Sequence, residues 1–237
     1  MNITKDKTVA QVVTENMGAD HVFSKYNIDF CCGGDITIEL ACKENGVEFK
    51  TLKNEIEAIT TLITNDKNFK EMDIISLINY SQKTYHKYIK ENIPMVSQLA
   101  VKVAEVHWRE HKEVVEVNNL FNKVISEIIE QLSNEENIIF PFLEKKIKLE
   151  NLNVKLNHEE LETFENSIKN IEKSYKNTGD IFKRISKLTS NYSLPEGACN
   201  TYKLLYEKLQ EFELELHKFI HFEKNILFPK VLESNKL

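Results

Sequence analysis

The chain has 237 residues, of which 41% are hydrophobic and 29% charged, and its formal net charge is −6. This balance is typical of one or two globular domains with a real core, and six Gly and four Pro are too few for a loop-rich all-β protein. An acidic chain without a basic block is a poor nucleic-acid partner, and no apolar run approaches the ~20 residues that cross a bilayer. The first residues lack the form of a signal peptide. We therefore expect a cytoplasmic protein without membrane contact.

The N-terminal part, 1–65, is expected to form a small helical domain. Short helices separated by glycine or polar breaks are predicted over 8–16, 19–26, 37–44 and 50–64. Asp35 or Thr37 can cap the third of these helices, and Gly46 follows its end. The polar stretch that comes next, 66–73, is typical of a linker and marks the predicted domain boundary.

The remainder, 74–237, is expected to form four long amphipathic helices. Apolar residues recur there at three- and four-residue intervals, the spacing of one helix face, over 73–111, 114–148, 155–177 and 197–232. The apolar face of the second of these helices consists of Val117, Val124, Ile128, Ile138 and Phe142. Four such helices indicate an up-down four-helix bundle, so the fold class is all-α.

A seven-residue phrase occurs twice in the chain. Glu-x-Asn-Ile-(Ile/Leu)-Phe-Pro stands at 135–141 and again at 223–229, 88 residues further on (223 − 135 = 88). The repeat makes the second and fourth helices of the predicted bundle equivalent. Each copy then brings one carboxylate to the centre of the bundle.

Polar side chains interrupt the apolar face of every helix in the predicted bundle: His86, Glu135, His158 and Glu223. Burying an ionised carboxylate without a partner costs several kcal/mol, so an unpartnered buried carboxylate tends to be protonated. Imidazole and carboxylate ligands suit Fe, Mn or Zn, and helical bundles can hold two metals bridged by carboxylates. These residues favour a metal site. The alternative is that each one is a satisfied core group, or a surface residue whose face is misassigned.

Two further histidine pairs are spaced i,i+4. His107 and His111, in HWREH, could hold a metal on a helix face. We favour a solvated helix end, because no carboxylate is obviously aimed at them. His217 and His221 lie about 200° round the helix from Glu223, so we interpret them as surface or interface residues.

The chain has four cysteines: Cys31, Cys32, Cys42 and Cys199. This spacing does not indicate a disulfide framework, and the absence of Cys-x-x-Cys gives a thiolate zinc site little support. Cys31 and Cys32 precede a predicted helix start, where backbone N–H groups and the helix dipole could lower a thiol pKa. The residues alone support a reactive pair and two small buried residues equally. Cys42 and Cys199 are expected to be structural.

Several motifs together resemble the iron–sulfur cluster repair (RIC) proteins over essentially the whole chain. They are DFCCGG at 29–34, YHKYIKENIP at 85–94, VAEVHWREH at 103–111, PEGAC at 195–199 and the two Phe-Pro phrases. The resemblance implies an N-terminal domain with a functional thiol pair, Cys31 and Cys32, and a hemerythrin-like bundle with a non-haem di-iron centre. It also implies a role in restoring iron–sulfur clusters damaged by nitric oxide or peroxide, with this protein as an iron donor.

The ligand pattern of that family has one His on the first helix and one on the third, with His-x-x-x-Glu on the second and the fourth. The positions that match are His86, Glu135, His158 and Glu223. Two positions depart, because Gln131 and Phe219 stand where the remaining histidines are expected. Glutamine offers only a carbonyl oxygen and phenylalanine offers no ligand. The resemblance therefore implies iron affinity lower by about an order of magnitude or more.

Three functions remain open at this stage. The first is a stress-response di-iron protein that acts on damaged iron–sulfur proteins. The second is a binding or thiol module that has lost productive iron, which Gln131 and Phe219 would favour. The third is nitric oxide reduction at the metal site, so the residues leave open whether the protein is an enzyme. An N-terminal domain on a polar linker could also exchange between the subunits of a homodimer.

Overall fold

The computed structural model describes residues 3–62, 68–152 and 158–233. Within these ranges the chain is helical and has no β-strand, so the all-α prediction is confirmed. The chain divides into two compact units, one made of Met1–Leu77 with His217–Leu237 and the other of Ile78–Leu216. Each unit has its own apolar core. None of the described helices is long and apolar enough to cross a membrane.

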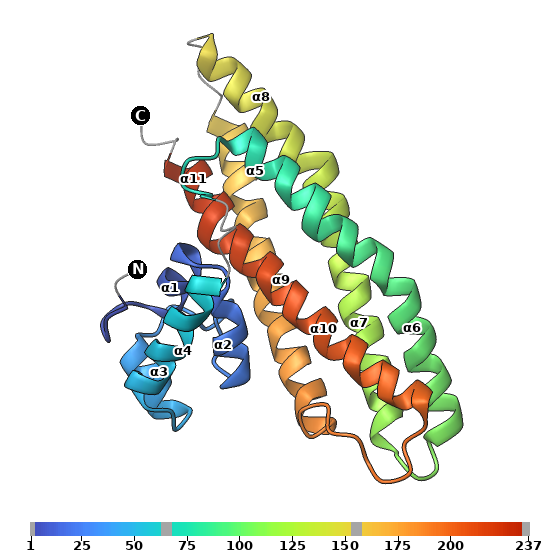
Figure 1. Cartoon of the computed structure of the whole chain (residues 1–237). Helices are drawn as coiled ribbons and strands as arrows, with labels where there is room; N and C mark the ends of the chain where they lie inside the picture. The colour runs from blue at the N-terminus through green and yellow to red at the C-terminus, as the bar shows by residue number, and fades with distance from the viewer. Residues whose placement is uncertain (1–2, 63–67, 153–157, 234–237) are drawn as a thin grey trace. The chain divides into compact units, whose positions relative to one another are not determined.

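The first unit begins with short helices, drawn in blue to cyan in Figure 1: α1 (Val9–Glu15), α2 (Ala19–Lys25), α3 (Ile38–Glu44) and α4 (Phe49–Leu62). Thr8 and Gln11 form a reciprocal capping box at the start of α1, in which each side chain accepts from the backbone N–H of the other. Of the two residues predicted to cap α3, Thr37 does so, accepting from the Leu40 N–H. These side chains satisfy backbone donors that would otherwise lack a partner in the helix.

The C-terminal segment of the chain also belongs to the first unit. It contains the last residues of α10 (Asn200–Phe222), the π-helical turn η3 (Glu223–Leu227) and α11 (Phe228–Glu233). The Phe222 ring lies edge-on to Phe69, with ring centroids 5.2 Å apart, and Lys230 donates to the carbonyls of Lys70 and Met72. Residues 66 and 67 of the predicted linker lie outside the described residues, and Phe69 in the remainder is buried.

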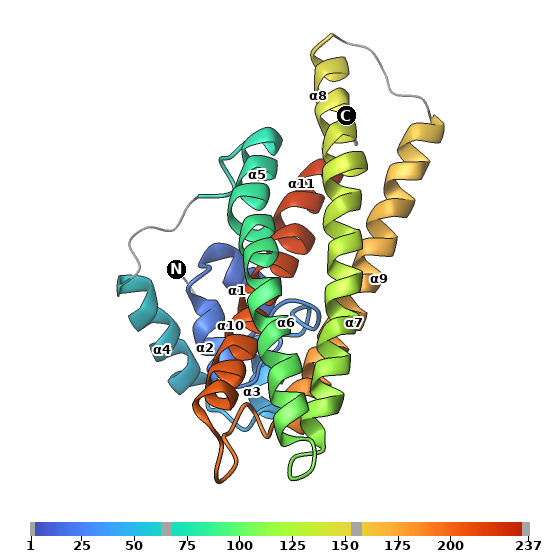
Figure 2. The ribbon, with the colours of Figure 1, turned by 90° about the vertical axis from the view of Figure 1, so that its right-hand side faces the viewer.

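The second unit is an up-down bundle. Its elements are the end of α5 (Ile74–Ser81), η1 (Gln82–His86), α6 (Lys87–His107), α7 (Glu113–Asn134), η2 (Glu135–Ile139), α8 (Phe140–Asn151), α9 (His158–Leu188) and α10 as far as Leu216. Figure 2 shows α7 running between α6 and α9, both of which it contacts. Phe212 of α10 is fully buried. Its ring neighbours are Tyr88 of α6, Phe121 of α7 and Phe182 of α9, which places Phe212 at the centre of the bundle core.

The third long helix is longer than predicted. The sequence predicts a helix over 155–177, of which 155–157 lie outside the described residues, whereas α9 continues to Leu188. Gly179 suggests an end near 177, since glycine inside a helix costs about 1 kcal/mol relative to alanine. Ile181, Phe182 and Ile185 are buried beyond it. Burial of three large apolar side chains outweighs that cost.

The predicted apolar face of the second helix is wrong by one position near its end. Ile138 is 57% exposed and its neighbour Ile139 is buried, and Leu143 rather than Phe142 lies fully in the core. The cause is η2, the π-helical turn over Glu135–Ile139. A π-turn adds one residue to the helical repeat, so every side chain after it moves to the next position. A pattern of uniform 3.6-residue spacing cannot anticipate this shift.

Candidate metal centre

His86 is the first predicted ligand, and it lies in the core of the second unit. Its side chain is 1% exposed, and it stands at the last position of η1. The ring stacks on Phe140 with centroids 5.6 Å apart. Its Nδ1 lies 2.8 Å from Oε1 of Glu136. Since a carboxylate only accepts, Nδ1 carries the proton of this hydrogen bond, and Nε2 is the ring nitrogen that could bind a metal ion.

Glu135 faces the Nε2 atom of His86. Its carboxylate is 0% exposed, and Oε2 lies 3.0 Å from Nε2 of His86. Its other oxygen, Oε1, accepts a hydrogen bond of 2.8 Å from Nε2 of Gln131, one helical turn earlier on α7. A carboxylate oxygen and an imidazole lone pair this close repel each other unless a proton or a cation lies between them. The pair therefore fits a metal ion.

Glu136 and Lys90 form a second layer around His86. Lys90 donates two hydrogen bonds of 2.7 Å to the Glu136 carboxylate. Partial burial raises the pKa of Glu136, but the hydrogen bonds from Lys90 and His86 outweigh it, and the pKa lies below its usual value. The ionised carboxylate fixes the ring orientation and tautomer of His86, as second-layer carboxylates do for metal-binding histidines.

We expect Glu136→Gln to weaken iron binding about 10–100-fold, the usual effect of losing such a partner. The amide of glutamine can hold the ring by either of its two groups, so the tautomer with Nε2 free is no longer enforced. Competition with a coloured chelator measures the dissociation constant. Glu91→Gln, which changes an exposed carboxylate of α6, is the control. Equal affinities in the two variants would contradict this role for Glu136.

Each of the three π-helical turns in the described chain has a predicted ligand at one end. His86 ends η1, Glu135 begins η2 and Glu223 begins η3. Such turns are rare and occur frequently at functional sites, because the extra residue redirects side chains without ending the helix. The repeated phrase contained a signal for two of them. Its proline removes the i→i−4 hydrogen-bond donor of an ordinary helix, at Pro141 and at Pro229.

The other two predicted ligands are placed as follows. Glu223 belongs to the first unit and is 0% exposed. His158 begins α9, but its side chain lies outside the described residues. The structure thus brings His86 and Glu135 together within the second unit. The two departures from the expected pattern are also in the core, since Gln131 is 6% and Phe219 0% exposed.

The vicinal cysteines lie in the first unit, where Asp29 organises them. Its Oδ1 accepts from the backbone N–H groups of Cys31 and Cys32 and lies 3.4 Å from Sγ of Cys31. The two sulfur atoms are 3.6 Å apart. Gly34 makes the turn possible, because a Cβ at this position would come within 2.5 Å of the Phe30 carbonyl oxygen.

The expectation of a lowered thiol pKa is wrong for Cys31. Burial raises the pKa of Cys31 well above its usual value, and the neighbouring Cys32 and the Asp29 carboxylate raise it further. The backbone N–H groups that would have stabilised a thiolate donate to Asp29 instead. Cys31 is therefore a protonated thiol at neutral pH, and the thiolate is the nucleophilic form.

We expect iodoacetamide at neutral pH to modify the partly exposed Cys32 at least about tenfold faster than the buried Cys31. The rate at Cys31 should rise as the pH increases toward its raised pKa. Peptide mapping by mass spectrometry measures both rates, and the same measurement in urea, where both thiols are exposed, is the control. Faster labelling of Cys31 in the folded protein would contradict this assignment.

His221 is a buried contact residue, so of the two alternatives predicted for it, surface or interface, the surface one is wrong. It is 0% exposed, and its Nδ1 and Nε2 lie 3.2 Å from the Phe30 carbonyl and from the Thr14 hydroxyl, respectively. Burial lowers the pKa of His221 to about 4, against the opposing effect of the Phe30 carbonyl. His217, one turn earlier, lies edge-on to the Phe30 ring. Both histidines contact Phe30, in the segment that carries the cysteines.

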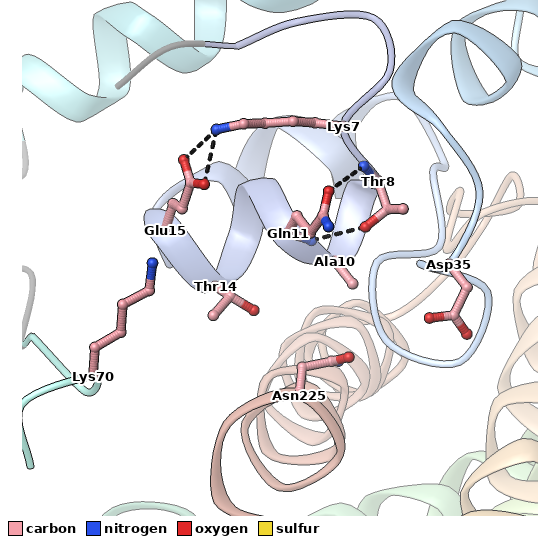
Figure 3. A pocket seen from close by; sticks show the side chains of 9 residues that line it. All are labelled: Lys7, Thr8, Ala10, Gln11, Thr14, Glu15, Asp35, Lys70 and Asn225. Atoms are coloured by element: carbon pink, nitrogen blue, oxygen red, sulfur yellow. Dashed lines mark hydrogen bonds and ion pairs between the residues drawn. The ribbon is translucent and has the colours of Figure 1, made fainter. Parts of the chain in front are cut away.

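The first unit also contains an open pocket of about 560 Å³ along α1 (Figure 3). Its charged groups are largely paired with one another or with nearby residues. Lys7 donates to both carboxylate oxygens of Glu15, and Asp35 accepts from Lys224. Gln11 lines the pocket too, but its side chain is engaged in the capping box. These contacts leave little for a ligand to bind, and we assign the pocket no function.

Family comparisons agree with the fold. Residues 78–231 match the hemerythrin HHE cation binding domain, and residues 5–60 match a domain of unknown function, DUF542. The chain is therefore a hemerythrin-like helical protein with a cation-binding domain.

Full-length relatives make the assignment more specific. An iron–sulfur cluster repair protein ScdA of Staphylococcus haemolyticus is 32% identical over 96% of this chain and 99% of its own. A probable iron–sulfur cluster repair protein of Haemophilus influenzae is 28% identical over 92% of both chains. The iron–sulfur cluster repair protein YtfE of Yersinia pseudotuberculosis is 26% identical over 91% of this chain and 92% of its own. The chain belongs to the family of iron–sulfur cluster repair proteins.

Proposed function

We propose that this protein repairs iron–sulfur clusters damaged by nitrosative or oxidative stress, and that its bundle holds iron. The observation that carries the proposal is the buried pair of His86 and Glu135, whose facing ligand atoms lie 3.0 Å apart. Imidazole nitrogen and carboxylate oxygen are suitable ligands for non-haem iron. When bound, iron would supply redox chemistry and an exchangeable ion for transfer to a client.

Four side chains are the proposed iron ligands: His86, Glu135, His158 and Glu223. The burial of Glu223 supports its inclusion, as does its position at the start of a π-turn that corresponds to that of Glu135. Gln131 positions Glu135 through its amide N–H, and Phe219 contributes no donor atom. A site with fewer imidazoles holds iron less tightly. This favours a protein that gives iron up over one that stores it.

The proposed clients are damaged iron–sulfur proteins of the cytoplasm, and Cys32 is the thiol that would meet them first. It is partly exposed while Cys31 is buried, so an approaching cluster or sulfur atom reaches Cys32 before its neighbour. Cys31 lies 3.6 Å behind it, close enough to act second. The vicinal pair then serves as a functional thiol pair that acts together with the iron.

Two measurements test this function. Purified protein reconstituted with ferrous iron should hold about two irons per chain, as carboxylate-bridged bundles do, with visible absorption that apoprotein lacks. The loaded protein should also restore the activity of a [4Fe–4S] hydro-lyase inactivated by nitric oxide, faster than free ferrous iron at the same concentration. A colourless, well-folded protein that binds no iron would contradict the proposal, as would reactivation no faster than with free iron.

A second candidate function is a binding or thiol module that has lost productive iron. Gln131 and Phe219, both buried where the family pattern has histidine, are the observations that favour it. This alternative predicts that the unmodified protein does not retain iron through gel filtration, and that reactivation of the client depends on Cys31 and Cys32 alone. Two results together would exclude this alternative: the unmodified protein retains iron, and the Glu135→Gln variant no longer reactivates the client.

A further inference from the structure

His107 and His111 lie near further potential metal ligands at one end of the bundle in the second unit. His107 ends α6, and its Nε2 lies 3.3 Å from Sγ of Cys199, in the loop that precedes α10. His111 lies in the turn between α6 and α7, and its Nδ1 is 3.3 Å from Oε1 of Glu113. Neither the carboxylate nor the thiol could be predicted from the spacing of residues along the chain. The turn and the loop lie at the same end of the bundle in Figures 1 and 2.

The rings of His107 and His111 both pack against the buried ring of Tyr202. Tyr202 is 0% exposed, and the rings of His107 and His111 meet it edge-on with centroid separations of 5.2 and 5.6 Å. The Tyr202 hydroxyl lies 3.1 Å from that of Tyr206. The imidazoles therefore rest on a fixed surface, one helical turn apart, while Cys199 is exposed and Glu113 partly exposed.

The distances within each pair match those of ligands on one zinc ion. Zn–N bonds of about 2.0–2.1 Å and Zn–S bonds of about 2.3 Å at a tetrahedral centre place N and S about 3.5 Å apart, and N and a carboxylate O about 3.4 Å apart. The two pairs stand side by side, since the imidazole centroids are 6.2 Å apart. Two imidazoles on one tetrahedral ion have centroids about 5 Å apart. The two pairs do not yet surround one point, so a shared ion requires the partly exposed side chains to rotate toward each other.

We propose that His107, His111, Cys199 and Glu113 bind one zinc ion, or another divalent ion of similar softness. Four donors are the number that a closed tetrahedral site needs, and a thiolate favours zinc over the harder ions that carboxylates prefer. The site is separate from the His86–Glu135 pair, because the 21 residues of α6 set the two about 30 Å apart. An ion here would fasten the α6–α7 turn to the start of α10.

Cobalt(II) distinguishes this site from the other metal site by its spectrum. A thiolate bound to cobalt gives a near-ultraviolet charge-transfer band, which imidazole and carboxylate ligands do not give. The background is the full chain with Cys31→Ser, Cys32→Ser and Glu135→Gln, which removes the vicinal thiols and weakens the other site. We expect the band to appear and to saturate at one equivalent of cobalt, and zinc to displace it.

Substitutions of the proposed ligands test whether the cobalt band comes from this site. Cys199→Ser should abolish the band, and His111→Ala should weaken cobalt binding at least about tenfold. Cys42→Ser is the matched control and should leave the band unchanged. Circular dichroism verifies folding, which is not at risk at Cys199 because its side chain is exposed. Absence of the band, or its persistence in Cys199→Ser, would overturn the proposal. The proposal would also be overturned if the protein bound no cobalt and His107 only activated the Cys199 thiolate.

Discussion

Replacing Glu135 by glutamine is expected to abolish iron binding while leaving the metal-free protein as stable as before. The glutamine side chain has the same shape and can still accept the hydrogen bond from Gln131, but it lacks the charge that attracts a cation. Loss of a direct ligand should exceed the ~10–100-fold effect of losing a second-layer partner. Elemental analysis after reconstitution measures the iron, and urea unfolding in the presence of a chelator measures the free energy of unfolding.

The stability measurement separates a metal site from an ordinary buried ion pair. If Glu135 were only the partner of a charged His86, its neutralisation would break a buried ion pair and leave Glu136 alone to compensate that charge, at a cost of up to about 3–5 kcal/mol. If Glu135 and His86 are instead two ligands of a metal ion, the metal-free variant loses no ion pair, and we expect a change below about 1 kcal/mol. Glu127→Gln is the control, since Glu127 also lies on α7 and accepts hydrogen bonds from Asn177. Full iron content in Glu135→Gln would exclude Glu135 as a ligand.

The fold follows from patterns that operate within each helix. Apolar spacing indicated the four long helices, and the polar residues that interrupt it indicated His86 and Glu135, which the structure places 3.0 Å apart. This worked because a charge on an apolar face is costly to bury, so its presence there implies a compensating partner. The same reasoning makes Glu223 a buried residue, as observed.

The features that escaped prediction depend on interactions between distant segments or on non-standard helical turns. His221 is buried by Phe30 and Thr14, 191 and 207 residues away in the chain, and no periodicity within its own helix could indicate this. Ile138 and Ile139 exchange places because η2 adds a residue to the repeat. The Cys199 thiol meets His107 across 92 residues. Each of these is a tertiary contact or a register shift that local spacing does not encode.

Replacing Gln131 and Phe219 together by histidine is expected to raise the affinity for iron at least about 10–100-fold, because each change supplies a neutral nitrogen donor one turn before a carboxylate. Without iron, the double variant should be less stable by about 2–4 kcal/mol, since a fully buried phenylalanine is lost and a polar ring is buried in its place. With iron, the thermal midpoint should rise above that of the metal-free variant by more than it does in the unmodified protein.

Measuring both iron affinity and reactivation of the damaged hydro-lyase shows what Gln131 and Phe219 contribute to function. A donor must release its ion, so tighter binding in the double variant should slow reactivation of the damaged hydro-lyase even though the protein carries more iron. Glu130→His is the control, because it adds an imidazole at an exposed position of α7. Faster reactivation by the double variant would mean that iron loading, not iron release, limits repair. Gln131 and Phe219 would then be losses of function, rather than adjustments of a donor site.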